Sequence, residues 1–175
     1  MIGLARGIVQ IAPYSNEWKE AYKQEEAQLH SLIGNYVLDI QHVGSTSIEG
    51  LASKPIIDIA VGVKTLKDVE KFKSILEDNG YHFRDNAGVE GRLMFAKGSE
   101  ELRTHYIHIE VFGDKLWKNH IYFRDYLRLH KDLVDEYAEL KKELGTKFGD
   151  DRGSYTSSKH EFIEKTLKKA YEFFE

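Results

Sequence analysis

Apolar residues recur every three to four positions in several segments of the chain, a spacing that gathers them on one face of a helix. The first helix is expected to follow Pro13. The second starts at Thr65, which opens a capping-box pattern with Asp68, and ends near residue 80. Beyond residue 114 the pattern is helical, with apolar stripes over residues 123–130, 133–148 and 163–174. These stripes predict a helical C-terminal third.

The remaining apolar segments have the length and composition of β-strands. They cover residues 8–11, 36–43, 55–63, 81–84, 92–97 and 105–112. The segment 55–63 is apolar almost throughout, as in a strand covered on both faces. The order of elements predicts an α/β (α+β) protein with a small, mixed, twisted sheet, flanking helices and a C-terminal helical cap. At 175 residues we expect a single domain, residues 1–175, whose helices from about residue 114 pack onto the sheet.

The composition narrows the classes of partner and cofactor. A net charge of −4 argues against general nucleic-acid binding. Because the chain has no cysteine, disulfides and thiolate metal sites are excluded, and any metal would be held by carboxylate, imidazole, carbonyl or water. No apolar run approaches the ~20 residues of a membrane span, and the N-terminus is too weakly apolar for a signal peptide. We therefore expect a cytoplasmic protein with no membrane partner.

A single carboxylate, Asp58, lies between two isoleucines in the apolar segment 55–63. A buried ionised carboxylate is costly unless it is paired, hydrogen-bonded or bound to a metal. Side chains alternate along a strand, so His108 and Glu110 share one face of the strand at 105–112 and meet Asp58 if the two strands are neighbours. This set suits Mg²⁺ or Mn²⁺ and is compatible with Zn²⁺. In the alternative interpretation, Asp58 is a cap or an ion-pair partner, and His108 and Glu110 are half-exposed.

A glycine-hydroxyl loop, Gly-Ser-Thr-Ser at 44–47, joins the strand at 36–43 to the connection before Asp58. Its backbone N–H groups and hydroxyls suit a phosphate, although such clusters are more often turns or helix caps. Three cationic side chains are candidates to reach the same phosphate, and their alternative roles are surface charge or helix anchoring. The candidate phosphate-binding residues are Gly44, Ser45, Thr46, Ser47, Lys54, Arg103 and Lys159. We expect them to line one concave surface with Asp58, His108 and Glu110.

Two stretches, HVGSTSI at 42–48 and GLASKPIIDI at 50–59, resemble the signature of the GrpB family, whose members are similar in fold to nucleotidyltransferases. The resemblance extends to Arg103-Thr104-His105 with His108, to FRDYL at 123–127, and to Tyr155 with Lys159. It covers nearly the whole chain from about residue 8. The resemblance implies that the predicted sheet is of the nucleotidyltransferase type.

The wider nucleotidyltransferase pattern is an apolar residue, Gly, then Gly or Ser, a gap, and a pair of carboxylates spaced Asp-x-Asp or Asp-x-Glu. Gly44, Ser45 and Asp58 resemble it, with residues 46–57 as the gap, but the second carboxylate would stand at position 60, where this chain has Ala60. Two-metal transfer normally uses both carboxylates. Catalysis would therefore require that His108 or Glu110 substitute for the missing one.

Three functional hypotheses follow, each with a nucleotide or another phosphorylated small molecule as partner. The first is an enzyme that transfers a nucleotidyl or phosphoryl group, with Asp58, His108 and Glu110 as catalytic and metal-binding residues and Mg²⁺ or Mn²⁺ as cofactor. The second is a non-catalytic nucleotide-binding or regulatory module that has lost a metal carboxylate, which Ala60 favours. The third is a metal-dependent phosphohydrolase that uses His108.

Overall fold

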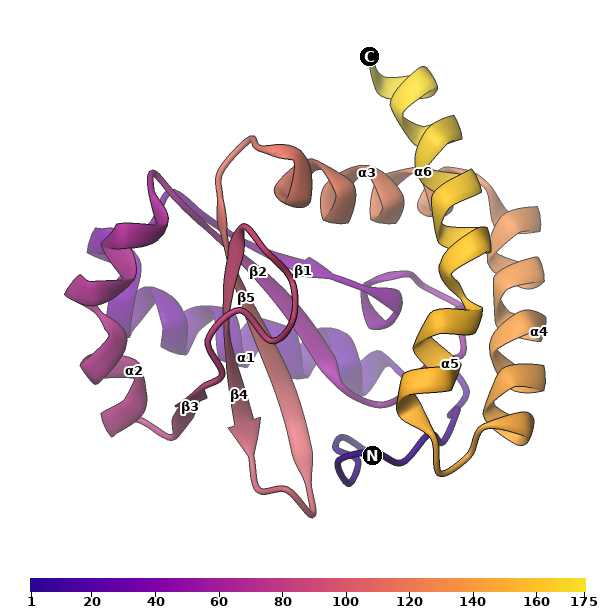
Figure 1. Ribbon diagram of the computed structural model, residues 1–175, viewed down its shortest axis with the longest axis horizontal. Helices are drawn as coiled ribbons and strands as arrows, with labels where there is room; N and C mark the ends of the chain where they lie inside the picture. The colour runs from indigo at the N-terminus through magenta and orange to yellow at the C-terminus, as the bar shows by residue number, and fades with distance from the viewer.

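The computed structural model describes residues 1–175 and centres on one five-stranded mixed sheet (Figure 1). The strand order is β1-β2-β5-β4-β3. Strands β2 and β5 are parallel, and the other neighbours are antiparallel. The strands are β1 (Asp39–Val43), β2 (Ile57–Val63), β3 (Tyr81–Phe83), β4 (Arg92–Gly98) and β5 (Arg103–Val111). The two central strands therefore carry the segments that sequence analysis singled out for Asp58 and His108.

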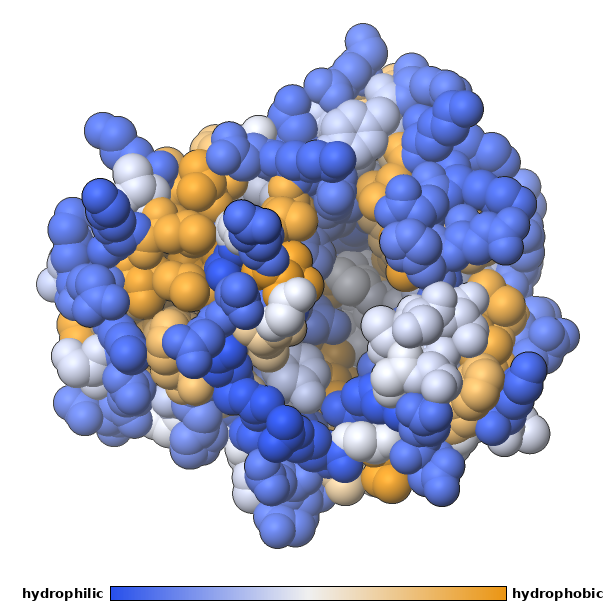
Figure 2. Space-filling model, in the orientation of Figure 1, coloured by the Kyte–Doolittle hydropathy of each residue, from blue (hydrophilic) through white to orange (hydrophobic).

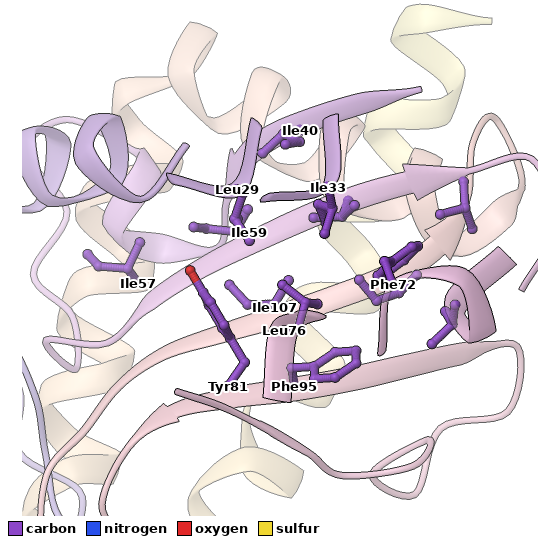
Figure 3. Close-up of a cluster of buried hydrophobic side chains, with 14 of the residues drawn as sticks. Leu29, Ile33, Ile40, Ile57, Ile59, Phe72, Leu76, Tyr81, Phe95 and Ile107 are labelled. Atoms are coloured by element: carbon purple, nitrogen blue, oxygen red, sulfur yellow. The ribbon is translucent and has the colours of Figure 1, made fainter. Parts of the chain in front are cut away.

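One face of the sheet is covered by α1 (Asn16–Ile33), α2 (Lys73–Asp78) and the 3₁₀ helix Leu66–Lys71. Ser15 caps α1 by accepting a hydrogen bond from the backbone N–H of Glu17. Apolar side chains of all five strands face these helices and form the main core (Figure 3). Its labelled members include Leu29, Ile33, Ile57, Ile59, Phe72, Leu76, Phe95 and Ile107. The middle of this face is closed by packing.

The opposite face of the sheet is only partly covered, by the C-terminal helices. These are α3 (Lys115–Leu129), α4 (Lys131–Lys147), α5 (Arg152–Ser158) and α6 (His160–Phe174). Helix α3 crosses one end of the sheet, where Trp117 packs on Ala60, and α4, α5 and α6 stand to one side of it (Figure 1). A second core joins α3 and α4 to the segment after β1 through Ile48, Leu51, Leu127, Val134 and Tyr137. Figure 2 shows a hollow between the sheet and helices α5 and α6.

The predicted α/β architecture with a C-terminal helical cap is confirmed, but the strand predicted at 8–11 is wrong. This segment lies against the end of α4, where the backbone N–H of Val9 donates to the carbonyl of Gly149 across 2.8 Å. Nearby, Ala12 forms only an isolated bridge with Ser53. Apolar character alone led to the prediction, and the partner that buries these residues is a helix rather than the sheet.

Three other boundaries differ from the sequence-based expectation. Strand β1 begins at Asp39, because residues 34–36 form a 3₁₀ turn after α1. The helix predicted from Thr65 is broken at the buried Phe72 into a 3₁₀ helix and α2, although the capping box of Thr65 and Asp68 is present. The helix predicted over residues 163–174 begins earlier, at His160, directly after α5 ends at Ser158. None of the helices combines the length and apolar character needed to cross a membrane.

Candidate functional site

The register of the two parallel strands brings Asp58 and His108 together. Ala60 of β2 is paired with His108 of β5, and Gly62 with Glu110, so the predicted trio shares the face toward α3. Oδ1 of Asp58 lies 2.9 Å from Nε2 of His108. Nδ1 of His108 lies 3.1 Å from an Nη atom of Arg92. Because a guanidinium only donates, Nδ1 is the acceptor, and Nε2 carries the proton donated to Asp58.

The loop at 44–47 lies directly against the Asp58 carboxylate. Gly44 has a φ of 72°, and a Cβ atom there would stand 2.9 Å from Oδ2 of Asp58. Only glycine allows this close approach of loop backbone to carboxylate. Burial opposes ionisation of Asp58, but the hydrogen bond from His108 and nearby positive charge hold its pKa below the usual value. The carboxylate is therefore ionised at neutral pH and remains one-third exposed.

A cavity of about 410 Å³ extends from this carboxylate between the sheet and the C-terminal helices (Figure 2). Of the residues predicted to form the site, five line it: Gly44, Ser45, Lys54, Asp58 and Lys159. Its apolar wall consists mainly of side chains from α3 and α6, namely Leu116, Phe123, Ile163 and Leu167. The volume lies within the range of small-molecule sites, about 300–1,000 Å³.

Three lysines gather on two tyrosine rings at one end of the cavity. The Nζ atoms of Lys54 and Lys159 lie 5.3 Å and 4.6 Å from the centre of the Tyr155 ring. Nζ of Lys141 lies 4.8 Å from the centre of the Tyr137 ring and has no hydrogen-bond partner. The lysine ion pairs of this protein involve other residues. None of these three lysines therefore forms a salt bridge with a carboxylate, although the charge of Asp58 in the same cavity attracts Lys54 and Lys159.

The surroundings of these lysines disfavour their charged forms. Burial, together with repulsion from Lys159 and Arg152, lowers the pKa of Lys54 to about 7. Burial also lowers the pKa of Lys159 to about 8, and the pKa of fully buried Lys141 falls well below its ordinary value. An anion in the cavity would offset both the desolvation and the mutual repulsion.

Three residues predicted for this surface lie elsewhere. Thr46 and Ser47 line a second cavity behind the loop, where Oγ1 of Thr46 lies 2.9 Å from Nε2 of His42. Arg103 points to the opposite side of the sheet from Asp58, and an Nη atom of Arg103 donates to the carbonyl of Gly98 across 2.8 Å. Strand alternation explains this placement, because Arg103 and Ile107 share a face. The prediction that all these side chains line one concave surface is wrong for these three, and it is also wrong for His108 and Glu110, which contact lining residues but do not line the cavity themselves.

Glu110 is on the predicted face but is covered by α3 rather than open to the cavity. It is 1% exposed, and Oε1 lies 2.9 Å from Nε2 of His120. His120 itself lines the cavity. The position of the missing carboxylate is also closed, because Ala60 is fully buried against Val43 and Trp117.

The FRDYL segment at 123–127 lies behind the loop and holds it in place. Arg124 donates to the carbonyl of His42 across 2.9 Å. Arg128, one residue beyond the segment, donates through Nε and an Nη atom to the carbonyl of Ser47, across 3.1 Å and 2.7 Å. These bonds fix the backbone on both sides of Gly44. The two arginines therefore position the loop from outside the cavity.

Sequence analysis missed four residues of this region: Arg92, His120, Tyr137 and Lys141. A signal existed for Lys141, because it interrupts the apolar face of α4 four residues after Tyr137. A lysine on an apolar stripe indicates either a stem that reaches solvent or a buried ammonium. For His120 no comparable signal exists, since its place depends on how α3 crosses the sheet.

Comparisons with known proteins agree with this architecture. The family model GrpB protein matches residues 8–169. The chain is 41% identical over 171 residues to the glutamate-rich protein GrpB of Alkalihalophilus pseudofirmus, which covers 95% of this chain and 98% of that protein. It is 37% identical over 156 residues to YqkA of Bacillus subtilis, covering 89% of this chain but only 45% of YqkA.

Solved structures show the same relationship. The crystal structure of the conserved protein GrpB from Enterococcus faecalis has a TM-score of 0.87 and 33% identity, covering 95% of this chain and all of that one. The Cid1 poly(U) polymerase, solved with MgGTP, has a TM-score of 0.52 at 16% identity, covering 78% of this chain and 44% of Cid1. The second likeness shows the fold alone, and it confirms the predicted nucleotidyltransferase-type sheet. The chain belongs to the GrpB family.

Proposed function

We propose that the cavity binds a phosphorylated small molecule, a nucleotide in the first instance, with its phosphates between the loop at 44–47 and the lysine cluster. The cluster of Lys54, Lys141 and Lys159, which forms no salt bridge with a carboxylate, carries this proposal. Unpaired buried ammonium groups destabilise a fold, and a phosphate supplies the missing charge and acceptor oxygens. The backbone beside Ser45 supplies further donors.

The other walls of the cavity support a ligand with an apolar or aromatic part. Leu116, Phe123, Ile163 and Leu167 provide an apolar surface beyond the lysines. Such a wall suits a nucleobase, which stacks on or packs against apolar side chains. The Cid1 structure of the same fold contains MgGTP, which supports a nucleotide as the ligand class.

A divalent cation, Mg²⁺ or Mn²⁺, belongs to this proposal at Asp58, with His108 and Glu110 behind it. The residues present suit one cation beside the phosphates, because Asp58 is ionised and one-third exposed. They do not suit the paired-metal arrangement of group transfer, because Ala60 lies under Trp117. A binding or regulatory module is therefore favoured over a transferase, as Ala60 indicated.

Nucleotidyl transfer remains the second candidate, and one contact favours it. The Asp58 carboxylate stands against the backbone of Gly44, so a cation there would be adjacent to phosphates held by the loop. The phosphohydrolase hypothesis gains no such support. Both ring nitrogens of His108 are engaged, one by Asp58 and the other by Arg92.

A thermal-shift screen tests the proposal with inorganic triphosphate and the four common nucleoside triphosphates, each with and without Mg²⁺ or Mn²⁺. We expect at least one compound to raise the melting temperature of the wild type and to lose this effect in Lys141→Met. Lys142→Met is the matched control, because Lys142 is exposed on the same helix and pairs with Glu139. No shift with any compound, or equal binding by both variants, would overturn the proposal.

A further inference from the structure

We propose that His120 of α3 joins His108 and Glu110 of β5 in a site for a transition-metal ion, one that binds Zn²⁺ or Mn²⁺ in preference to Mg²⁺. One ligand atom from each of the three side chains lies within 4.8 Å of the others. The inference rests on the proposed function in one respect only, which is that the metal ion would lie beside the phosphates of the proposed ligand. The site itself needs no phosphorylated ligand.

The backbone arrangement explains why these three side chains converge. His108 and Glu110 are two residues apart on β5 and therefore share a face of the sheet. Helix α3 crosses this face and directs His120 onto it, so that Nε2 of His120 lies 2.9 Å from Oε1 of Glu110. Metal–ligand bonds of about 2.1 Å place neighbouring ligand atoms about 3 Å apart. The existing separation between Glu110 and His120 already matches that value.

Glu110 is the strongest indication of a ligand. Its side chain is 1% exposed, and neither carboxylate oxygen accepts a hydrogen bond, despite the proximity of His120. Buried carboxylates are normally hydrogen-bonded or bound to a metal, because an unsatisfied one is costly. A cation between Glu110 and His120 would satisfy both side chains.

His108 is already prepared for this role by its hydrogen bond to Asp58. Nε2 carries the proton that is donated to Asp58, so Nδ1 is the nitrogen that carries the lone pair, which now accepts from Arg92 across 3.1 Å. A metal-binding histidine commonly donates its other N–H to a carboxylate, which fixes the ring and its tautomer. Asp58 would then orient His108 while its exposed oxygen faces the cavity.

The Arg92 guanidinium now contacts Nδ1 of His108, the atom that a metal ion would bind. Arg92 and Glu110 are paired across β4 and β5, and the Arg92 guanidinium contacts Nδ1 of His108. Its charge partly compensates those of Glu110 and Asp58. Metal binding therefore requires that Arg92 swing away, so removal of its charge should strengthen metal binding.

The chemistry of the ligands identifies the class of ion. Two imidazoles and one carboxylate suit Zn²⁺, Mn²⁺, Co²⁺ or Fe²⁺, whereas Mg²⁺ prefers oxygen ligands in an octahedral arrangement. Three protein ligands leave coordination positions free, and His120 and Asp58 both border the cavity. An ion here would be open to an oxygen of a ligand in the cavity.

The experiment titrates metal-free wild-type protein with Co²⁺, Zn²⁺, Mn²⁺ and Mg²⁺, without nucleotide, by calorimetry and by the visible spectrum of Co²⁺. We expect one site, with Mg²⁺ weakest, and affinity for Co²⁺ more than about tenfold lower in His120→Gln. His160→Gln is the matched control, because His160 is exposed on α6. Arg92→Met should bind Co²⁺ more tightly than wild type.

Three results would overturn the proposal: no wild-type binding, equal binding by wild type and His120→Gln, or weaker binding by Arg92→Met. Should His120→Gln fail to fold, the Arg92→Met measurement still decides the question. Binding of inorganic triphosphate is measured separately in the presence of EDTA. Loss of the metal site would leave triphosphate binding at the lysines intact, and absence of triphosphate binding would leave the metal result standing.

Discussion

Asp58 accepts a hydrogen bond from Nε2 of His108 across 2.9 Å, between neighbouring parallel strands. The same carboxylate lies against Gly44, which allows loop backbone to approach it. It therefore links the loop at 44–47 to the polar residues beneath α3. Asp58 is the point at which a phosphate site and a metal site would meet.

Replacement of Asp58 by asparagine tests whether the Asp58 carboxylate binds a ligand or only stabilises the fold. Asp58→Asn keeps an oxygen that accepts the proton of His108, so we expect the free energy of unfolding to fall by less than about 1.5 kcal/mol. Metal-dependent stabilisation by a nucleotide should be lost, because the charge is removed. Melting curves of both proteins, with and without Mg²⁺ and ATP, provide the measurement. A loss of about 3–5 kcal/mol, with no ligand effect in the wild type, would identify a structural ion pair instead.

Lys141 should stabilise the complex with triphosphate and destabilise the protein without ligand. Lys141→Met replaces a fully buried amine that has no hydrogen-bond partner by an apolar side chain of similar length. We expect the free energy of unfolding without ligand to rise by about 1–4 kcal/mol, while triphosphate binding weakens. Chemical denaturation measures the first effect and calorimetry the second. A destabilised variant with unchanged binding would show that Lys141 is only a packing residue.

A carboxylate introduced at position 60, where the nucleotidyltransferase pattern has its second one, should not produce an active enzyme. In Ala60→Asp the new side chain would lie in the fully buried space occupied by Val43 and Trp117. We expect a loss of about 3 kcal/mol or more and no nucleotidyl transfer. Ala60→Ser is the control for added size. A stable Ala60→Asp protein with metal-dependent transfer of a labelled nucleotide would show that the missing carboxylate alone had silenced an enzyme.

The loop should depend on Arg128, although this side chain lies outside the cavity. Arg128 donates two hydrogen bonds to the carbonyl of Ser47, and lysine reproduces at most one of them well. In Arg128→Lys we expect triphosphate affinity to fall about fivefold, which corresponds to about 1 kcal/mol. Lys131→Ala is the control, because Lys131 is exposed and pairs with Asp135. Equal affinities of wild type and Arg128→Lys would contradict a positioning role.

The site could be predicted from sequence where it depends on strand geometry. Alternation along β2 and β5 correctly placed Asp58 and His108 on one face, and the glycine-hydroxyl loop correctly placed Ser45 beside them. The same alternation, applied to Arg103, would have excluded it from the cavity. Arg103 was predicted for the site because of its positive charge and its place in the Arg103-Thr104-His105 stretch.

The remaining parts of the site depend on how helices pack, which a single sequence does not encode locally. Lys141 is on the apolar stripe of the helix predicted over residues 133–148, and only the packing of that helix places its amine near Lys54 and Lys159. His120 reaches Glu110 because α3 crosses the sheet at Trp117. Lys159, by contrast, lies four residues after Tyr155, and this helical spacing is enough to bring its Nζ atom near the Tyr155 ring.

The most direct test of phosphate binding at the lysine cluster is the number of protons taken up when ATP binds. In the free protein the pKa of Lys54 is about 7 and that of Lys159 about 8, so both are partly neutral at pH 8. A bound anion raises these pKa values, so binding takes up protons, and affinity falls as pH rises from 7 to 9. Calorimetry at pH 8, in two buffers of different ionisation enthalpy, should show net uptake of about one proton per ATP, reduced in Lys54→Met. Absence of binding, or binding without proton uptake, would contradict the account.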